Sequence, residues 1–221
     1  MKVLVACEES QVVCKAFRAK GHEAYGCDIL PCSGGHPEWH IQQDILVVID
    51  QMRREIIEYE QSFRLSFCQV TIPWEWDLMI AHPPCTFLCN SGVRWLYNDD
   101  GSLNEQRWQN MKLGAEFFKK LLYSPIPRIV IENPIMHQYA REEVGVNCGQ
   151  LIQPWQFGNP NTKATGFWLK NVPALKPTKI IPKEDRINTI HKMPPSDHRG
   201  KDRSVTFAEV AEAMADQWGS L

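Results

Sequence analysis

The sequence lacks a long apolar run, an excess of positive charge and any repeated or low-complexity region. A membrane span needs roughly 20 apolar residues in succession, and no stretch of the chain approaches this length. The 24 basic residues are balanced by 26 acidic ones, so the net charge of −2 gives no argument for binding nucleic acid. Residues 1–9 turn acidic too early for a signal peptide, and we therefore expect a cytoplasmic protein.

The chain also lacks the secretory signal that would favour disulfides between its eight cysteines. Reduced thiols are the expected state, which leaves a cysteine available for chemistry. The length of 221 residues and the hydrophobic content of 43% suit one sizeable α/β core and are short for two. We therefore predict a single domain that spans residues 1–221.

The N-terminal residues alternate between strand and helix patterns. Residues 2–6 form a short apolar run, and residues 12–20 carry a helical pattern that ends at Gly21. A second strand, residues 22–27, ends in Asp28. Strand, helix and strand in this order indicate a parallel sheet, so we predict an open, mostly parallel, doubly wound α/β fold of the Rossmann-like type.

Residues 46–74 interrupt this alternation and are predicted to be an insertion. Within them, residues 51–61 carry an amphipathic helical pattern, and the pattern becomes ambiguous after it. A buried-strand pattern resumes over 76–81 and stops before Pro83-Pro84-Cys85, whose prolines fix an extended turn and remove amide donors. The strand therefore delivers a cysteine to a loop.

The second half of the chain repeats the helix and strand patterns. A helix is predicted over 104–123 and a strand over 128–131. The apolar side chains of this helix recur at helical spacing and are Leu113, Phe117, Phe118 and Leu121. The tail predicts a helix over 206–218 that begins with Thr206 and Glu209 at the spacing of a capping box.

Polar or reactive residues follow four of the predicted strands. They are Glu8, Asp28, Cys85 and Glu132. In an open parallel sheet, ligands bind outside the carboxyl ends of the strands, and an acidic residue about 20 positions after the first loop holds the ribose hydroxyls of an adenosine-type cofactor. Asp28 has this place, although an Asp that merely ends a strand remains the alternative.

The order of these motifs resembles that of the cytosine-C5 DNA methyltransferases. The motifs are the strand and loop at 3–11, Asp28, Gln43-Asp44-Ile45, Pro83-Pro84-Cys85 with Ser91-Gly92 after it, and Ile131-Glu132-Asn133-Pro134. The resemblance covers nearly the whole chain. Residues 153–158, 162–163, 168–170 and the tail from 203 are similar to small members encoded by phages and prophages, which lack a full target-recognition domain.

The resemblance implies transfer of a methyl group from S-adenosylmethionine to C5 of cytosine in DNA. Cys85 would add to C6, because C5 becomes nucleophilic only when the ring is an enamine. Glu132, partly buried and with a raised pKa, would protonate or hydrogen-bond N3. Lys163 would supply the cation that an arginine provides in the family, with a solvated surface lysine as the alternative. The implied substrate-binding residues are Pro84, Ser91, Asn133, Gln153 and Gln156.

The resemblance also implies a cofactor site. Asp28 would bind the ribose hydroxyls and Asp44 the adenine amino group, with a helix N-cap as the alternative role of Asp44. The family's first loop is rich in glycine, whereas the loop at 6–11 has none and carries two carboxylates. The implied cofactor-binding residues are Ala6, Cys7, Glu8, Ser10, Gln11, Asp28, Ile29, Asp44, Ile45 and Pro83.

Residues 171–203 stand where the sequence-specific enzymes insert a target-recognition domain. This segment holds eight Lys or Arg against four Asp or Glu, which suits phosphate contacts without base readout. An ordinary solvated loop is the alternative. We expect sequence specificity to be low, short or supplied by a protein partner.

Two further groups of residues are candidates for a function. The spacing of Cys27, Cys32, His36 and His40 differs from that of zinc fingers, so we predict no metal site. Packing is the expected role of most tryptophans, with base stacking considered only for Trp95. The tryptophans concerned are Trp74, Trp76, Trp95, Trp108, Trp155 and Trp168.

Three alternative functions remain. An amino-group methyltransferase is disfavoured, because that chemistry wants an aromatic residue after the two prolines, where Cys85 stands. A catalytically silent nucleic-acid-binding or regulatory homologue is the alternative from another class. C5 methylation of RNA or of a free nucleotide keeps the same chemistry on another substrate.

Overall fold

A computed structural model describes residues 1–63, 76–197 and 199–221. Of the predicted insertion at 46–74, the part up to residue 63 continues a helix, and 64–74 lies outside the described residues. Trp74 is therefore outside the description as well. The helix covers the amphipathic pattern at 51–61, which confirms that element.

One seven-stranded sheet forms the centre of the molecule, in the order β3-β2-β1-β4-β5-β7-β6. Among these strands, β7 runs in the direction opposite to that of all the others. The predicted open, mostly parallel, Rossmann-like α/β fold is thereby confirmed. The strands are β1 Lys2–Ala6, β2 Glu23–Asp28, β3 His40–Gln42, β4 Leu78–Ala81, β5 Arg128–Pro134, β6 Gln150–Ile152 and β7 Thr165–Lys170.

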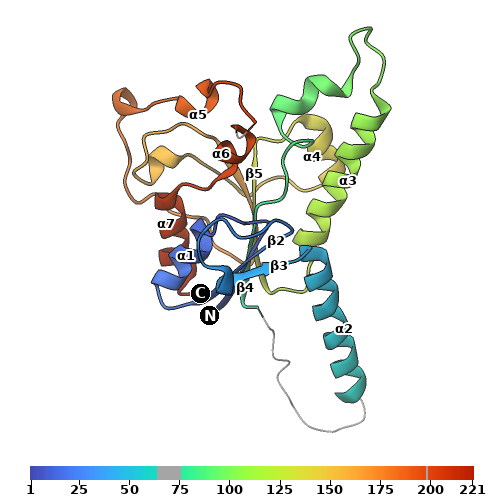
Figure 1. Cartoon of the computed structure of the whole chain (residues 1–221), viewed down its shortest axis with the longest axis vertical. Coiled ribbons are helices and arrows are strands. Elements are labelled where there is room, and N and C mark those ends of the chain that lie inside the picture. Colours follow the sequence, from blue (N-terminus) through green and yellow to red (C-terminus); the bar gives the residue numbers. More distant parts are fainter. Residues whose placement is uncertain (64–75, 198) are drawn as a thin grey trace.

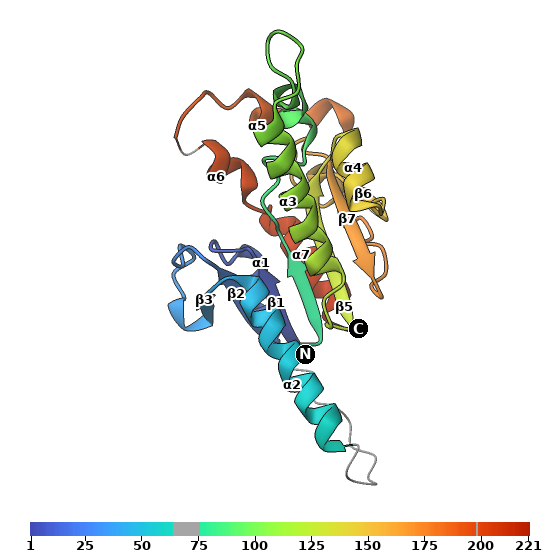
Figure 2. The ribbon, with the colours of Figure 1, turned by 90° about the vertical axis from the view of Figure 1, so that its right-hand side faces the viewer.

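Helices cover both faces of the sheet (Figures 1 and 2). Helices α1 (Val12–Ala19) and α7 (Ala208–Trp218) pack together on one face. Helices α2 (Ile45–Phe63), α3 (Glu105–Leu122) and α4 (Gln138–Val144) belong to the other. Because successive strand residues point to opposite faces, β1 directs Val3 and Val5 to the α1 side. Leu4 and Ala6 point to the α3 side.

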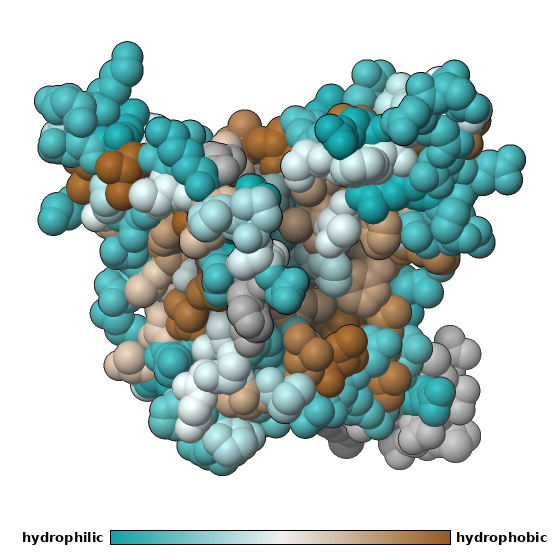
Figure 3. Space-filling model, turned by 45° about the horizontal axis from the view of Figure 1, so that its top comes forward, coloured by the Kyte–Doolittle hydropathy of each residue, from teal (hydrophilic) through white to brown (hydrophobic). Residues whose placement is uncertain are grey.

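Short helical elements lie mainly beyond the carboxyl edge of the sheet, where two arms of the chain rise (Figure 1). One arm contains α5 (Thr189–Lys192) and α6 (Arg199–Ser204), and the other contains α4 with the start of α3. The molecule is hollowed between the arms (Figure 3). The 3-10 turns are η1 Pro37–Trp39, η2 Asn90–Leu96, η3 Pro154–Gln156 and η4 Lys183–Asp185. None of the described helices is long and apolar enough to span a membrane.

The capping box predicted for the last helix is wrong. Helix α7 begins at Ala208 with Phe207 as its N-cap, and no side chain caps it. The Thr206 hydroxyl instead donates to Glu132, and the Glu209 carboxylate accepts from Asn159. Tertiary partners have therefore replaced the local capping pair.

The buried face of α3 also differs from the prediction. Leu113 is 56% exposed, although it was assigned to the apolar face. Residues two apart on a helix do not share a face. Leu113 is two positions from Met111 and from Ala115, the first two residues of the buried face, and therefore points away from that face. The buried residues of α3 are Met111, Ala115, Phe118, Leu121 and Leu122.

Strand β5 is longer than the predicted 128–131. It continues because β7 pairs with it, with Glu132 opposite Phe167 and Asn133 opposite Gly166. No strand was predicted over 165–170. Glu132 is therefore held inside a paired strand, which fixes its backbone more firmly than a loop would. Strand β4 in turn begins at Leu78 rather than 76, and Trp76 is buried just before it.

A candidate active site at the carboxyl edge of the sheet

The loop after β1 adopts the backbone conformation that glycine favours, although it contains no glycine. Cys7 has φ 59° and Gln11 has φ 58°, both in the left-handed region. For non-glycine residues this conformation costs about 1–2 kcal/mol each, and such strain concentrates at functional loops. The Cys7 amide donates to the Cys27 carbonyl at 2.7 Å, which holds the loop against the end of β2. Two non-glycine residues of this loop therefore hold a conformation that is usual for glycine.

The Glu8 side chain is turned into the protein. Only 6% of the residue is exposed, and its carboxylate accepts from the amides of Val13 at 2.7 Å and Cys14 at 3.2 Å. Burial raises the pKa of this carboxyl. Glu8 therefore satisfies the first amides of α1, which Gln11 leaves without a side-chain cap. Its carboxylate is not free to receive a cofactor, so only its backbone belongs to the predicted cofactor loop.

Glu8→Ala is expected to lower the free energy of unfolding by about 2 kcal/mol, because two buried amides lose their acceptor. Urea unfolding followed by circular dichroism measures the change. The matched control is Glu23→Ala at the exposed start of β2, for which a change within about 0.5 kcal/mol is expected. Equal stability of the two variants would contradict the capping role.

Residues 32–36 close over the rest of the first loop. The Gln11 side chain is fully buried, donates to the His36 carbonyl at 2.8 Å and accepts from the Cys32 thiol at 3.1 Å. A Cβ on Gly34 would lie 2.5 Å from the Ser10 carbonyl, so only glycine fits there. The Gln11 amide is therefore used inside the protein. In the described residues no group of His, Cys, Asp and Glu is arranged to hold a metal ion, and Cys27, Cys32, His36 and His40 each have separate partners.

Asp28 and Asp44 are brought to the same corner of the edge. The Gln43 amide donates to the Asp28 carbonyl at 3.0 Å, and both carboxylates raise the pKa of the Cys7 thiol, after the larger effect of burial. Asp28 Oδ1 accepts from Leu30 at 2.9 Å, and Asp44 Oδ1 accepts from Leu46 at 2.9 Å, as a helix N-cap does. In each, Oδ2 has no hydrogen bond within the described chain. Both carboxylates can therefore accept from a ligand.

His82 and Glu132 form a buried pair at the ends of β4 and β5. The register pairs Ala81 with Ile131, so the next residues of the two strands lie side by side on the α7 face. His82 Nδ1 lies 2.8 Å from Glu132 Oε2, and the two side chains are 13% and 10% exposed. The Thr206 hydroxyl donates to the same oxygen at 3.3 Å. Glu132 Oε1 has no hydrogen bond within the described residues, so it can face a substrate.

The pKa of Glu132 is lowered to about 2, which corrects the prediction that it is raised. Burial alone would raise this pKa, but the hydrogen bond and charge of His82 outweigh it, and Lys163 and Thr206 lower it further. The pKa of His82 is raised in turn, because the two nearby carboxylates outweigh its burial. The two shifts favour an imidazolium beside a carboxylate. The prediction failed because the partner of Glu132 was not recognised.

Cys85 begins a tight turn beyond β4. Its carbonyl accepts from the amides of Leu88 and Cys89, each at 3.0 Å, which places the two cysteines together. The Cys89 sulfur lies 3.0 Å from the Ser91 hydroxyl. The interaction between the two neighbouring thiols raises the pKa of Cys85 and lowers the pKa of Cys89. Cys89 therefore gives up its proton more readily than Cys85.

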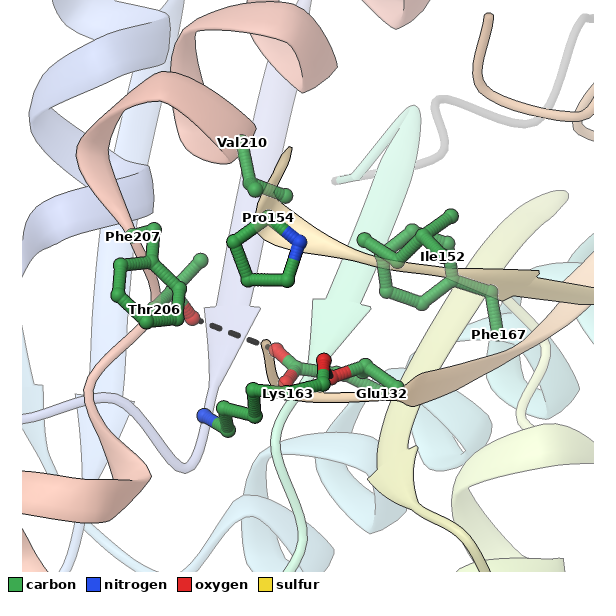
Figure 4. Close-up of a pocket in the computed structure, with 9 residues that line it drawn as sticks. Glu132, Ile152, Pro154, Lys163, Phe167, Thr206, Phe207 and Val210 are labelled. Carbon is green, nitrogen blue, oxygen red and sulfur yellow. Dashed lines mark hydrogen bonds between the residues drawn. The ribbon is translucent and has the colours of Figure 1, made fainter. Parts of the chain in front are cut away.

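Lys163 meets Glu132 at a small cavity that α7 and β7 wall in (Figure 4). Its ammonium lowers the pKa of Cys85 and of Glu132, so the charge of Lys163 reaches both of these residues. Gln153 accepts from the Lys163 amide at 3.0 Å, and Gln156 accepts from the Gln153 amide at 2.7 Å. The two glutamines therefore fold the loop that positions the lysine. The cavity is lined by Glu132, Ile152, Pro154, Lys163, Thr165, Phe167, Thr206, Phe207 and Val210.

The remaining predicted residues have mixed surroundings. Pro83 is buried and Pro84 exposed, as the turn before Cys85 requires. Asn133 is fully buried, donates to the Pro134 carbonyl at 2.7 Å, and its Oδ1 has no partner in the described chain. Ile29 is 69% exposed beside Asp28, which suits contact with an apolar ring. Ile45 is buried at the start of α2, where it packs in the core rather than facing a ligand.

The tryptophans divide into packed and exposed ones. Trp76 and Trp168 are buried, and Trp108 packs edge-on against Tyr139 with ring centroids 4.9 Å apart. Trp155 lies under the Arg186 guanidinium at 3.5 Å. Trp95 is 51% exposed on the second arm, and the Arg94 guanidinium lies over its ring at 4.0 Å, so at most the other face of the ring is open for stacking.

Three residues of the site were not predicted. They are His82, Cys89 and Thr206. The sequence did contain a signal for His82. This histidine stands directly before the two prolines, where it continues the strand that lies beside the strand of Glu132. Cys89 follows Cys85 by one turn and could have been paired with it from spacing. No sequence signal indicated Thr206, since it reaches the site only through the packing of α7.

No protein-family model matches the sequence, and no curated protein matches it. Among solved structures, one assigned as a DNA modification methyltransferase encoded within an E. coli prophage is similar, at 14% identity and a TM-score of 0.43. The S. pombe Dnmt2 methyltransferase has 18% identity and a TM-score of 0.40, and a Spodoptera frugiperda DNMT2 triple mutant has 15% and 0.38. The matches cover 82%, 79% and 89% of this chain and 52%, 51% and 60% of the three structures. The chain thus spans about half to three fifths of their length.

Proposed function

We propose that the chain transfers a methyl group from S-adenosylmethionine to C5 of cytosine in DNA, through a covalent bond between Cys85 and C6. The observation that carries this proposal is the position of Glu132. Its carboxylate is held through Oε2 by His82 and Thr206, so that Oε1 remains for a substrate on the edge where Cys85 and Lys163 lie. A nucleophile and a proton-transferring group at one edge are what addition to a cytosine ring requires.

The residues around Asp28 fit S-adenosylmethionine. The free oxygens of Asp28 and Asp44 would accept from the ribose hydroxyls and the adenine amino group, and exposed Ile29 would contact the adenine ring. The backbone of residues 6–8 would border the methionine portion. When bound, the cofactor supplies an electrophilic methyl group.

Cys85 reaches the attacking state through its neighbour. As its sulfur bonds to C6, the Cys85 proton would pass to the thiolate form of Cys89, whose pKa the neighbouring Cys85 lowers. The Lys163 ammonium stabilises negative charge on the Cys85 sulfur, and it lies in a cavity shared with Glu132. Glu132 Oε1 faces N3 of the ring and handles the proton that N3 takes up on addition.

DNA would lie across the hollow between the two arms (Figure 3). The arm that contains α5 and α6 belongs to the basic segment 171–203, and its Lys and Arg residues would contact phosphates. The start of the segment lies elsewhere, because Lys176 hydrogen-bonds to Gln217 at the end of α7. Trp95 on the other arm would offer a stacking surface. A protein partner that adds sequence specificity belongs to this proposal as well.

The test is incubation of the full chain with methyl-labelled S-adenosylmethionine and a panel of DNA, RNA and free cytidine nucleotides. We expect label in DNA at C5 of cytosine, and a stable protein adduct with DNA that contains 5-fluorocytosine, since fluorine cannot leave as a proton does. Label found only in RNA, or only in the nucleotide, would indicate that the same chemistry acts on that substrate instead of DNA. Cofactor binding without transfer to any substrate would favour the catalytically silent homologue.

A further inference from the structure

Glu132 lacks the proton that addition to cytosine takes up at N3. Its pKa of about 2 leaves it ionised at neutral pH, so a carboxylate alone cannot act as the acid. The proton must come from a group in contact with it. Two side chains touch its Oε2, the Thr206 hydroxyl at 3.3 Å and the His82 imidazole at 2.8 Å, and of these only the imidazole releases a proton near neutral pH.

His82 is fixed beside Glu132 by the sheet itself. Its amide donates to the Ala6 carbonyl at 2.9 Å, and its side chain follows the register that joins β4 to β5. The Nδ1 atom of His82 points at Glu132 Oε2, and the two atoms form an ion pair when His82 is protonated. Both side chains are almost entirely buried. A short, largely buried contact of this kind suits proton transfer between the two groups.

The charges that face His82 favour its protonated form. Glu132 on β5 and Glu8 after β1 are negative, whereas Lys163 before β7 is positive and burial opposes the charge. The net effect raises the pKa of His82. Its Nε2 has no hydrogen-bond partner in the described chain, so the carboxylates alone stabilise the imidazolium. Removal of the charge on Glu132 therefore removes most of that support.

We propose that His82 is a positioning residue that acts through Glu132, by passing its Nδ1 proton to the carboxylate as that carboxylate protonates N3 of the bound cytosine. This inference rests on the proposed function and deepens it. The pair, rather than Glu132 alone, is the acid of the reaction.

The proton and charge balance of the step closes within the site. The Cys85 sulfur forms the bond to C6 and gives its proton to Cys89, while the electron pair of the C5–C6 double bond moves into the ring toward N3. N3 takes a proton from Glu132, which takes one from His82. The imidazolium becomes neutral, Glu132 ends as it began, and the thiolate of Cys89 becomes a thiol. When Cys85 leaves the ring, N3 returns its proton to the pair.

The first measurement is the titration of His82 by NMR of the full chain with labelled histidine, assigned with His82→Gln. In the wild type we expect a pKa above the ordinary histidine value. In Glu132→Gln we expect a pKa below it, since burial and Lys163 remain while the main opposing charge is gone. A wild-type value at or below the ordinary one, or no change in Glu132→Gln, overturns the proposal.

The second measurement is the rate of adduct formation with 5-fluorocytosine DNA as a function of pH. The wild-type rate should fall as pH rises through the pKa of His82, because the imidazolium is lost. His82→Gln can still donate a hydrogen bond to Glu132 but carries no transferable proton, so we expect a loss of about 10²-fold at neutral pH. Its rate should recover toward acid pH, where Glu132 without the imidazolium becomes protonated more readily.

The matched control is His22→Gln, at the opposite edge of the sheet before β2, which should keep the wild-type rate and pH profile. A His82→Gln variant with the wild-type rate and profile overturns the inference and leaves the proposed function standing. Absence of any adduct in the wild type overturns the proposed function, and the inference with it. A His82→Gln loss that is equal at every pH also overturns the relay, because it indicates a structural role only.

Discussion

Cys85→Ser should reduce methyl transfer by at least about 10⁴-fold while the affinity for S-adenosylmethionine stays near that of the wild type. Serine keeps the size of the side chain, but its hydroxyl cannot pass a proton to Cys89 and become a nucleophile at neutral pH. The residues proposed to hold the cofactor lie at β1, β2 and β3, apart from the turn that carries Cys85. Single-turnover transfer of labelled methyl and calorimetric titration of the cofactor measure the two quantities.

Cys148→Ser is the matched control, because Cys148 is another half-buried free thiol and lies before β6, outside the site. It should retain wild-type transfer. Loss of activity in both variants would point to a general sensitivity of the fold, and normal turnover in Cys85→Ser would refute covalent catalysis by this residue.

Glu132→Gln should reduce methyl transfer by about 10³-fold, since the amide neither accepts the proton from His82 nor passes one to N3. Thr206 and His82 can still hydrogen-bond to the amide oxygen, so the fold is expected to persist. Thermal unfolding and single-turnover kinetics, measured on the same preparation, separate the two effects.

Glu212→Gln on the exposed side of α7 provides the control for Glu132→Gln. It makes the same chemical change close by without touching the cavity, and activity should be unchanged. If Glu132→Gln retained activity within a few-fold of wild type, the acid would have to be another group, and Lys163 would be the next residue to substitute.

Much of the architecture follows from local patterns in the sequence. The alternation of β1, α1 and β2 could be predicted because each element carries its own apolar period and ends at its own polar residue. Cys85 and Glu132 could be placed at one edge in the same way, since parallel strands that end in reactive residues deliver them there. Lys163 came from the family resemblance alone, because the strand that follows it was not predicted. The predicted fold was therefore confirmed in its main layers, whereas the roles of these residues stay predictions.

What escaped prediction depends on contacts between distant segments. Strand β7 was missed because its pairing with β5, not its own pattern, makes it a strand. The pKa of Glu132 was predicted in the wrong direction because burial was considered without His82. The capping box at Thr206 failed because a tertiary acceptor competes with the helix end. In each case a partner far along the chain outweighed a correct local rule.

The contact between Thr206 and Glu132 joins residues 74 positions apart and brings α7 to the site. In the order of biosynthesis, β5 is made well before this segment. The nascent chain can build most of the sheet while the acid of the site still lacks one of its two donors, and α1 still lacks the helix that packs against it. The proposed activity should therefore appear only once α7 has docked on the sheet.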